Sequence, residues 1–418
     1  MYIQRSLEKT IQKTEKGFKS ILVTGPRQVG KSTLLKHLYK DRRYITFDNP
    51  VLLAETMKEP GLFFRNNKPP VILDEVQYIT ELFPYIKMEC DKSDQKGQFL
   101  LTGSQQYHLM KNVSESLAGR IAILELAGLS LREIQQDSFD KPFIPTEEYI
   151  HERELSYHPC KNIWEIIHRG GYPALTDPDV DWQTFYGSYV QTYLERDINE
   201  LGNVKDKLKF TQFLTAMAAR TGGMLNYSSV ASQIEITAAT AKEWTSLLEA
   251  SGIIYIMHPY SNSALTRAVK TPKMYFRDTG LVCFLTKYQT AETAMNGALA
   301  GELFETFAVS EILKSFSNAG RDYQMYVTYY RGKDKLRKCQ TAPFAGREAE
   351  IDLIIEQNDT LYPVEIKMSA NPKLSMTNAF DVIERIPGKK RGTGVILCLY
   401  NSPLWLNANT AALPVEFC

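Results

Sequence analysis

Near its N-terminus the chain reads Gly25-Pro26-Arg27-Gln28-Val29-Gly30-Lys31-Ser32-Thr33, which fits the pattern G-x-x-x-x-G-K-[ST] at each fixed position. The apolar run at residues 21–23 precedes it and predicts a buried strand. Behind it, the spacing of apolar residues at positions 33–38 predicts a helix. A strand, a glycine-framed loop and a helix in this order form the context in which the pattern binds phosphate.

The residue types of this segment, called here the phosphate loop (residues 25–33), each have a physical reason. Gly25 and Gly30 let the backbone curve so that its N–H groups point inward at phosphate. The helix that begins near Lys31 adds the positive end of its dipole. We predict that Lys31 contacts the β- and γ-phosphates of ATP and that Ser32 binds Mg²⁺, with Pro26, Arg27, Gln28, Val29 and Thr33 completing the nucleotide site. A chance glycine-rich turn before a helix is the alternative.

Two carboxylates follow the second predicted strand, the apolar run at residues 71–73. Asp74 and Glu75 stand at its carboxyl end, where open α/β sheets place their ligand-binding groups. We predict that Asp74 holds Mg²⁺ and that Glu75 polarises the attacking water. Surface carboxylates also follow strands, so this interpretation depends on the phosphate loop upstream.

Two further catalytic candidates lie downstream. A third predicted strand, residues 98–101, leads to Ser104, which we favour as a γ-phosphate sensor or water-positioning residue; Thr102 and a simple strand-ending turn are the alternatives. Arg120 precedes a strand-like run at residues 121–124. Its guanidinium could stabilise charge on the transferred phosphoryl group, in its own chain or from a neighbouring subunit, and a surface salt bridge is the alternative.

The composition of the chain limits its class. Its 418 residues exceed the usual size of one domain, so we expect at least two. A net charge of +1 argues neither for nor against a nucleic-acid partner. The six cysteines are scattered without a C-x-x-C pair, which disfavours a disulfide framework or a zinc site. The polar N-terminus and the lack of a membrane-length apolar run predict a cytoplasmic protein without a membrane partner.

The segments GPRQVGKST, ITFDNP, VILDEVQ, FLLTGSQQ and SLAGR, in this order, resemble the AAA-type P-loop ATPase domain of a large group of prokaryotic ATP-binding proteins. Softer similarity continues through Gly170-Gly171-Tyr172-Pro173 and residues 193–197 and 301–305, so it covers most of the chain. The resemblance implies an AAA-type α/β core, ATP hydrolysis and a C-terminal domain of originally unknown function. It does not define a cellular role.

The middle of the chain is predicted to be mainly helical. Residues 133–159 are polar and irregular, which indicates a boundary or a surface excursion. Residues 182–201 are predicted to form a helix whose aromatic face, including Phe185 and Tyr189, packs into the core.

Residues 228–234 and 237–250 then predict two helices, and residues 253–257 and 273–277 two strands, which is a winged-helix pattern. The second helix carries Glu243 and Glu249 and is a poor reader of DNA bases. The following loop and strand supply Arg267, Lys270 and Lys273, which could meet phosphates. Packing or docking of a protein partner is the alternative to DNA contact.

The C-terminal part combines a predicted helix at residues 298–314 with a hairpin of strands at 350–356 and 361–367. The hairpin brings Asp352, Glu365 and Lys367 near one another, and such groups can bind divalent ions and activate water beside a phosphate. The spacing D-x₁₂-E-x-K resembles restriction-endonuclease-like nucleases, in which a helix glutamate, here Glu305, often completes the metal shell. This resemblance implies metal binding by Glu305, Asp352 and Glu365 and catalysis by Asp352, Glu365 and Lys367. Ile351 stands where these nucleases usually have proline, and an inactive copy of the fold is the alternative.

We therefore expect an α/β protein of four parts: an ATPase domain (1–137), a helical linker (138–225), a winged-helix-like module (226–292) and a restriction-endonuclease-like domain (293–418). Basic runs at 331–338 and 389–391 favour a nucleic-acid surface. One hypothesis is an ATP-driven enzyme that acts on nucleic acid, with DNA as partner. The other is an ATP-switched regulatory or assembly protein with an inactive C-terminal domain, which binds DNA, another protein or a second copy of itself.

Overall fold

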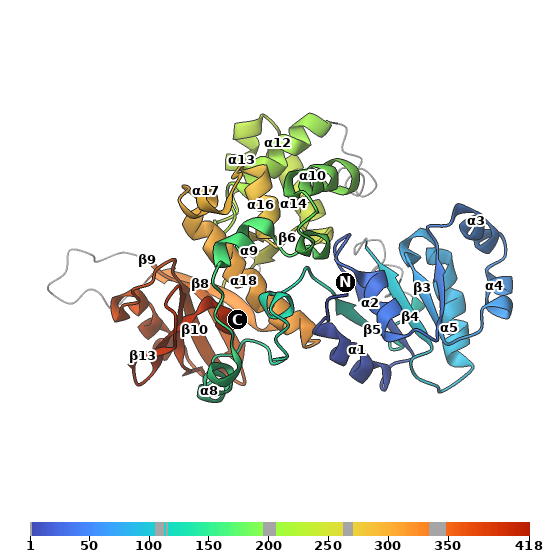
Figure 1. Ribbon diagram of the computed structural model, residues 1–418, viewed down its shortest axis with the longest axis horizontal. Coiled ribbons are helices and arrows are strands. Elements are labelled where there is room, and N and C mark those ends of the chain that lie inside the picture. The colour runs from blue at the N-terminus through green and yellow to red at the C-terminus, as the bar shows by residue number, and fades with distance from the viewer. Residues whose placement is uncertain (1, 105–112, 114–115, 195–205, 262–270, 334–347) are drawn as a thin grey trace.

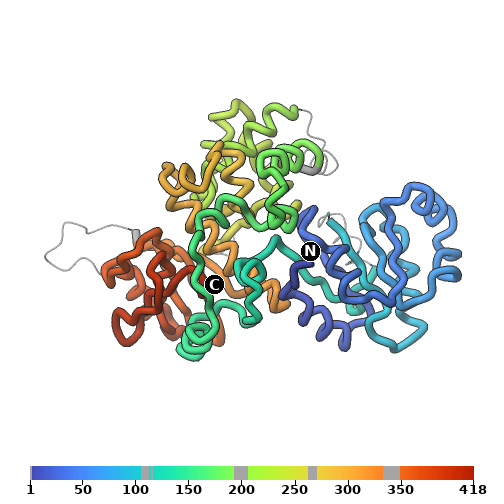
Figure 2. Tube along the Cα trace, in the orientation of Figure 1, coloured from blue at the N-terminus to red at the C-terminus, as the bar shows by residue number. Residues whose placement is uncertain are grey.

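The computed structural model describes residues 2–104, 113, 116–194, 206–261, 271–333 and 348–418. Figure 1 shows one β-sheet near the N-terminal end of the chain, a second near the C-terminal end, and a mainly helical region beside both. The trace in Figure 2 shows that the chain passes close to the C-terminal sheet in its green segment before it forms this helical region.

The N-terminal sheet has five strands in the order β2-β3-β4-β1-β5, and its paired strands are parallel. These strands are β1 (Ser20–Thr24), β2 (Arg43–Thr46), β3 (Val71–Asp74), β4 (Phe99–Gly103) and β5 (Ile121–Glu125). The accompanying helices are α1 (Leu7–Glu15), α2 (Lys31–Leu38), α3 (Pro50–Lys58), α4 (Pro60–Asn66) and α5 (Phe83–Asp91). Strands β1, β3 and β4 are buried along their whole length, as expected where both faces of a parallel sheet are covered. The four strands predicted from apolar runs are confirmed, whereas β2 contains only one buried residue and gave no such signal.

The segment after this sheet corrects our expectation of a surface excursion at residues 133–159. It contains α7 (Leu131–Ile134) and α8 (Glu147–Ser156). Arg153 is fully buried, pairs with Asp137 and donates a hydrogen bond to the Glu416 carbonyl at 2.8 Å. The Tyr149 hydroxyl donates to the Phe417 carbonyl at 2.6 Å. The segment therefore packs against residues 416–418, and the polar side chains of Tyr149 and Arg153 can be buried there because they are paired.

The middle region is helical, as predicted. Its helices are α9 (Ile163–Arg169), α10 (Trp182–Ser188), a π-helix (Tyr189–Leu194), α12 (Lys207–Ala218), α13 (Tyr227–Ile234), α14 (Ala238–Ala250), α16 (Thr279–Leu285) and α17 (Ala291–Met295). The helix expected over residues 182–201 changes to π geometry at Tyr189, and its end at 195–201 lies outside the described residues.

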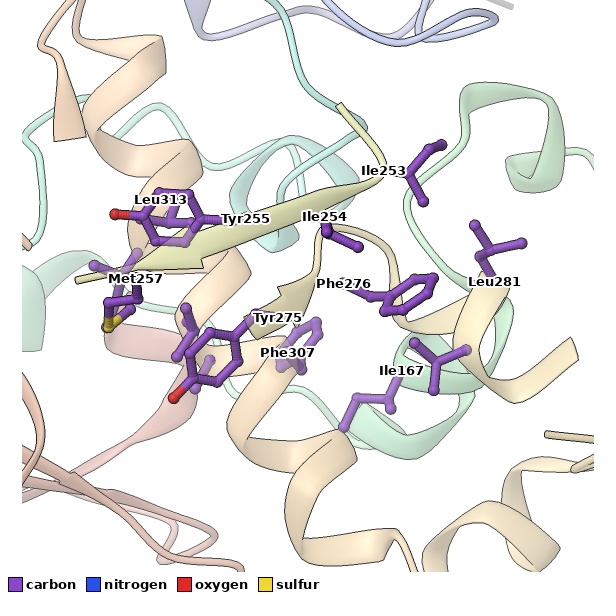
Figure 3. Packing of buried hydrophobic residues seen from close by; sticks show 14 of the residues in the cluster. Ile167, Ile253, Ile254, Tyr255, Met257, Tyr275, Phe276, Leu281, Phe307 and Leu313 are labelled. Carbon is purple, nitrogen blue, oxygen red and sulfur yellow. The ribbon is translucent and has the colours of Figure 1, made fainter. Parts of the chain in front are cut away.

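Strands β6 (Ile254–Met257) and β7 (Lys273–Phe276) pair antiparallel after α13 and α14, in the predicted order of elements. Figure 3 shows their apolar side chains beside Phe307 and Leu313 of α18 (Ala300–Asn318). Helix α18 also contacts β5 and the C-terminal strand β10 (Thr360–Ile366), so it packs against all parts of the chain. The winged-helix assignment stays a prediction, and Arg267 and Lys270 lie outside the described residues.

The C-terminal sheet contains β10 and β8 (Val327–Lys333), β9 (Glu348–Gln357), β11 (Lys390–Arg391), β12 (Gly394–Cys398), β13 (Leu404–Asn407) and β14 (Thr410–Pro414). Strands β9 and β10 form the predicted antiparallel hairpin. Asn358 and Asp359 connect them with positive φ angles of 49° and 59°, as a tight two-residue hairpin turn requires.

Candidate functional site

The phosphate loop follows β1 directly and ends where α2 begins. Gly25 has a φ of 143°, and a Cβ there would lie 2.0 Å from the Leu126 carbonyl oxygen, so the loop needs glycine at this position. The Lys31 side chain is buried, and its Nζ donates to the carbonyls of Gly25 at 3.0 Å and Pro26 at 2.8 Å. An ammonium group held in this way can exchange these carbonyls for phosphate oxygens without leaving the loop.

Ser32 and Asp74 meet at the carboxyl edge of the sheet. The Ser32 hydroxyl donates to Asp74 Oδ1 at 2.6 Å, and the hydroxyls of Thr102 and Tyr44 also donate to this buried carboxylate. Burial and the nearby Asp74 raise the pKa of Tyr44 above its ordinary value. The structure thus brings together the two groups predicted to bind Mg²⁺, and it adds Tyr44 of β2, which sequence reasoning missed.

Glu75 and Ser104 also lie together. Glu75 has a left-handed backbone with a φ of 57°, and its N–H donates to Thr102 Oγ1 at 3.2 Å. Ser104 Oγ lies 3.3 Å from Glu75 Oε2. The Gln77 amide donates to the Glu75 carboxylate and to Ser104 Oγ, the latter at 3.2 Å. Of the two candidates, Ser104 is therefore beside the predicted base, whereas Thr102 is bonded to Asp74. Sequence reasoning missed Gln77.

Arg120 lies at the opposite edge of the same sheet. Its carbonyl accepts a hydrogen bond from Ser20 N at 3.1 Å, and Ser20 begins β1, whereas the phosphate loop follows the end of that strand. Five strand residues separate the two edges by roughly 16 Å. The guanidinium pairs instead with Asp91, with Nε 2.7 Å from Oδ1. This placement rules against a role for Arg120 at the nucleotide of its own chain and agrees with the salt-bridge alternative. Arg120 could then contact a phosphate only if that phosphate were bound to a neighbouring subunit.

A cavity of about 870 Å³ opens between the phosphate loop and the middle region. Lys31, Ser32 and Glu75 line one side, and Phe185 and Tyr189 line the other. Its size falls in the range of ligand pockets, and its walls combine charged groups with aromatic rings. Phe185 and Tyr189, which the sequence predicted to face the core, therefore also border the predicted nucleotide site.

A buried arginine supports the phosphate loop from behind. Arg5 donates to the carbonyls of Val29 at 2.8 Å and Ala127 at 2.7 Å, and it pairs with Glu133 at 3.0 Å. A buried guanidinium is tolerated only with such partners. Arg5 therefore fixes the backbone of the phosphate loop at Val29, just before Gly30. The N-terminal sequence gave no sign of this role.

The second predicted site forms around the β9–β10 hairpin. Lys367 Nζ lies 3.0 Å from Asp352 Oδ2 and 2.6 Å from Glu365 Oε2. The backbone N–H of Ile366 also donates to Asp352, at 2.9 Å. The hairpin thus brings these three predicted residues together, as the sequence indicated.

Lys273 joins this site from β7. Its Nζ lies 2.8 Å from Glu350 Oε1, 3.5 Å from Glu305 Oε1 and 3.9 Å from Asp352 Oδ1. We call Glu305, Glu350, Asp352 and Glu365 the acidic cluster. The expectation that Lys273 meets DNA phosphates is wrong, because its side chain is only 5% exposed and is paired with carboxylates.

The environment shifts the pKa values of Glu305, Asp352 and Glu365 in different directions. Burial and the charge of Asp352 raise the pKa of Glu305 and bring that of Glu365 to about 8. Burial also opposes ionisation of Asp352, but Lys367 and Lys273 hold its pKa below the ordinary value. Within the described part of the chain, no group of three or more His, Cys, Asp or Glu residues is arranged to hold a metal ion. The metal centre expected at Glu305, Asp352 and Glu365 is therefore not preformed.

The basic run at residues 389–391 is largely neutralised. Lys389 pairs with Glu356 at 2.7 Å and with Asp359 at 2.5 Å. Arg391 pairs with Glu384 at 2.9 Å and Asp381 at 3.3 Å. These contacts weaken the argument for a nucleic-acid surface here. Most of the other run, residues 334–338, lies outside the described residues.

Two regions of the chain match protein families of unknown function, and its N-terminal region matches a third family. Residues 160–292 match a domain of unknown function (DUF8612), and residues 344–418 match another (DUF4143). Two uncharacterized proteins, Rv2008c of Mycobacterium tuberculosis and Mb2031c of Mycobacterium bovis, are each 26% identical over 359 residues, which is 85% of this chain and 71% of theirs.

Among solved structures, the Walker-type ATPase PABY2304 of Pyrococcus abyssi aligns with a TM-score of 0.40 and 16% identity over 68% of this chain and 96% of its own. In the described part of the chain, the helices are too short or too polar to cross a membrane.

Residues 17–135 match the family described as an AAA domain. With the phosphate loop in place, this match supports an AAA-type P-loop ATPase that binds and hydrolyses ATP.

Proposed function

We propose that the chain is a Mg²⁺-dependent ATPase whose nucleotide cycle controls its C-terminal region. One observation carries this proposal: β7 reaches both sites. Lys273 begins the strand inside the acidic cluster, and Arg277, the residue after the strand, pairs with Glu125 beside the phosphate loop. A shift of the loop on nucleotide binding can therefore move the strand that enters the second site.

In the nucleotide site, the amides of the phosphate loop and the Lys31 ammonium would hold the phosphates. The Ser32 hydroxyl and Asp74 carboxylate are oxygen donors of the kind that Mg²⁺ prefers, so they fit its binding. When bound, Mg²⁺ neutralises phosphate charge. Glu75 would orient the attacking water, with Ser104 and Gln77 holding its carboxylate in place.

The link to β7 begins at the strand next to the phosphate loop. Glu125 ends β5 opposite Thr24, the residue before the loop. The partly buried Arg277 pairs with Glu125 and donates to the Tyr323 hydroxyl at 3.0 Å, and this hydroxyl donates to Glu125 at 2.9 Å. Gly252, just before β6, also touches the loop, since a Cβ there would lie 3.1 Å from Pro26 Cγ.

The control function predicts that Arg277→Met separates the two sites. In the wild type, a non-hydrolysable ATP analogue with Mg²⁺ should change the hydrogen exchange of β7 and of the β9–β10 hairpin several-fold. The variant should still bind the analogue but lose this distant change, because Arg277 no longer ties Glu125 to β7. Hydrogen exchange with mass spectrometry measures both effects.

Arg321→Met is the matched control, because Arg321 is an exposed arginine of the same region that lies over the Tyr326 ring. It should behave as the wild type. Glu125→Gln should resemble Arg277→Met. An undiminished change in Arg277→Met, or no change in the wild type, would reject the proposed control.

A second candidate function is nucleic-acid cleavage by the C-terminal region. It is favoured by the approach of Lys367 to both Asp352 and Glu365, a combination suited to metal-assisted phosphodiester hydrolysis. Against it, Lys273 already pairs with the acidic cluster, and two of the three basic residues at 389–391 are paired with carboxylates. We therefore rank an ATP-controlled domain that does not cut above a nuclease.

A plasmid-nicking assay with Mg²⁺ or Mn²⁺ separates these two functions. We expect the wild type, Asp352→Ala and Lys367→Ala to leave supercoiled DNA equally intact, with or without ATP. Cleavage by the wild type that disappears in both variants would instead establish the nuclease, because contamination would cut in all three samples.

A further inference from the structure

The strongest unexplained feature is a lysine from one region buried in the acidic cluster of another. Lys273 lies within residues 160–292, whereas Glu350 and Asp352 lie within residues 344–418, and these ranges match different families. We propose that Lys273 is a built-in cation that occupies a divalent-cation position in the acidic cluster and keeps divalent ions out while β7 is docked.

The distances place the ammonium in a central position. Nζ lies within 4 Å of carboxylate oxygens from three residues, Glu305 of α18 and Glu350 and Asp352 of β9. The Tyr275 hydroxyl, from the same strand as Lys273, donates to Glu305 at 2.7 Å and holds that carboxylate toward the lysine. An ammonium this deeply buried persists only among such partners.

The charges of the site explain why a cation is needed. The acidic cluster contributes four carboxyl groups, and Lys367 forms ion pairs with two of them, Asp352 and Glu365. Glu305 and Glu350 share the ammonium of Lys273 as their cation. If Lys273 were removed, both carboxyl groups would face Asp352 with no positive charge between them. Carboxylate oxygens are the ligand type that hard divalent ions prefer, so removal of the ammonium would leave oxygens to which such an ion could bind after they rearrange.

Lys273 and a divalent ion cannot occupy this position together. A metal bound to Glu305 and Asp352 would need its oxygen ligands at about 2.0–2.6 Å. It would then lie beside the ammonium, whose positive charge repels it at low dielectric. Divalent binding and docking of Lys273 are therefore mutually exclusive, and withdrawal of β7 would open the position. This inference concerns the nucleotide-free chain and does not depend on ATP control.

The test is Mn²⁺ binding to the full, nucleotide-free chain, measured by calorimetry and by the electron paramagnetic resonance signal of free Mn²⁺. We expect Lys273→Met to bind one Mn²⁺ in the acidic cluster. Its affinity for this ion should be at least tenfold higher than that of the wild type. Lys273→Arg keeps the charge and should behave as the wild type. Adding Asp352→Asn to Lys273→Met should remove the new binding.

A second variant protects the test against misfolding of Lys273→Met. Glu350→Gln removes the nearest partner of Lys273 at a side chain that is 42% exposed, so the fold should tolerate it. It should loosen the lysine and give a smaller gain in Mn²⁺ affinity. The proposal is overturned if the wild type binds Mn²⁺ as tightly as the variants. It is equally overturned if no folded variant gains binding, or if Asp352→Asn leaves the gain unchanged.

Discussion

Lys31→Ala is expected to abolish measurable ATP hydrolysis and to weaken ATP binding about 10- to 150-fold. The ammonium lies inside the phosphate loop, on the carbonyls of Gly25 and Pro26, and no other described lysine or arginine donates to both carbonyls. A charged hydrogen bond contributes about 1.5–3 kcal/mol, which corresponds to this loss of affinity. Phosphate release and calorimetry with Mg²⁺ and ATP measure the two effects.

The matched control is Lys40→Ala, an exposed lysine just after α2. It should leave both turnover and affinity unchanged, because no phosphate is expected near it. Turnover of Lys31→Ala at the wild-type rate would contradict the assignment of residues 25–33 as the nucleotide site. Loss of activity with an altered circular dichroism spectrum would indicate misfolding and would require Lys31→Met in its place.

Glu75→Gln should produce a different pattern, with ATP bound but not cleaved. The amide keeps the size and hydrogen bonds of the side chain but cannot accept a proton from water. Loss of a general base costs about 100- to 10,000-fold in rate. Affinity for ATP should stay within a few-fold of the wild type, because Glu75 does not contribute to the phosphate loop. Single-turnover hydrolysis and equilibrium binding report these quantities separately.

Glu81→Gln is the control for charge, since Glu81 is an exposed glutamate six residues further along the chain. It should hydrolyse ATP normally. Equal loss of binding and turnover in Glu75→Gln would assign Glu75 to nucleotide binding instead. Full turnover in Glu75→Gln would move the role of base to another group, with Asp74 the nearest carboxylate in sequence.

Local patterns predicted much of the fold and of the nucleotide site. The β-branched run before Gly25 is a buried strand because a parallel sheet is covered on both faces. Asp74 meets Ser32 because each lies at the carboxyl edge of the sheet. The β9–β10 hairpin followed from two apolar runs around a short polar turn. In each case, a local pattern predicts the element, and the regular geometry of a sheet then places its residues.

The failures share another cause, which is packing between distant segments. The hydrophobic pattern of β7 could not reveal that Lys273 faces carboxylates more than thirty residues away. The polar residues around Arg153 gave the same composition as an exposed loop, although Arg153 itself is buried and donates to the carbonyl of Glu416. Arg120 is different: a residue that precedes a parallel strand lies at the amino edge, so its distance from the loop was predictable once the sheet was known to be parallel.

The contact of α8 with residues 416–418 has a consequence for biosynthesis. Tyr149 is separated from its acceptor, Phe417, by 268 positions along the chain. At about 5–20 residues per second, a ribosome needs roughly 13–54 s to make that stretch. The five strands of residues 20–125 can assemble during this time, but α8 must wait on the nascent chain with its arginine still hydrated. Synthesis of residues 416–418, rather than formation of the first sheet, therefore sets when this part of the molecule can acquire its final structure.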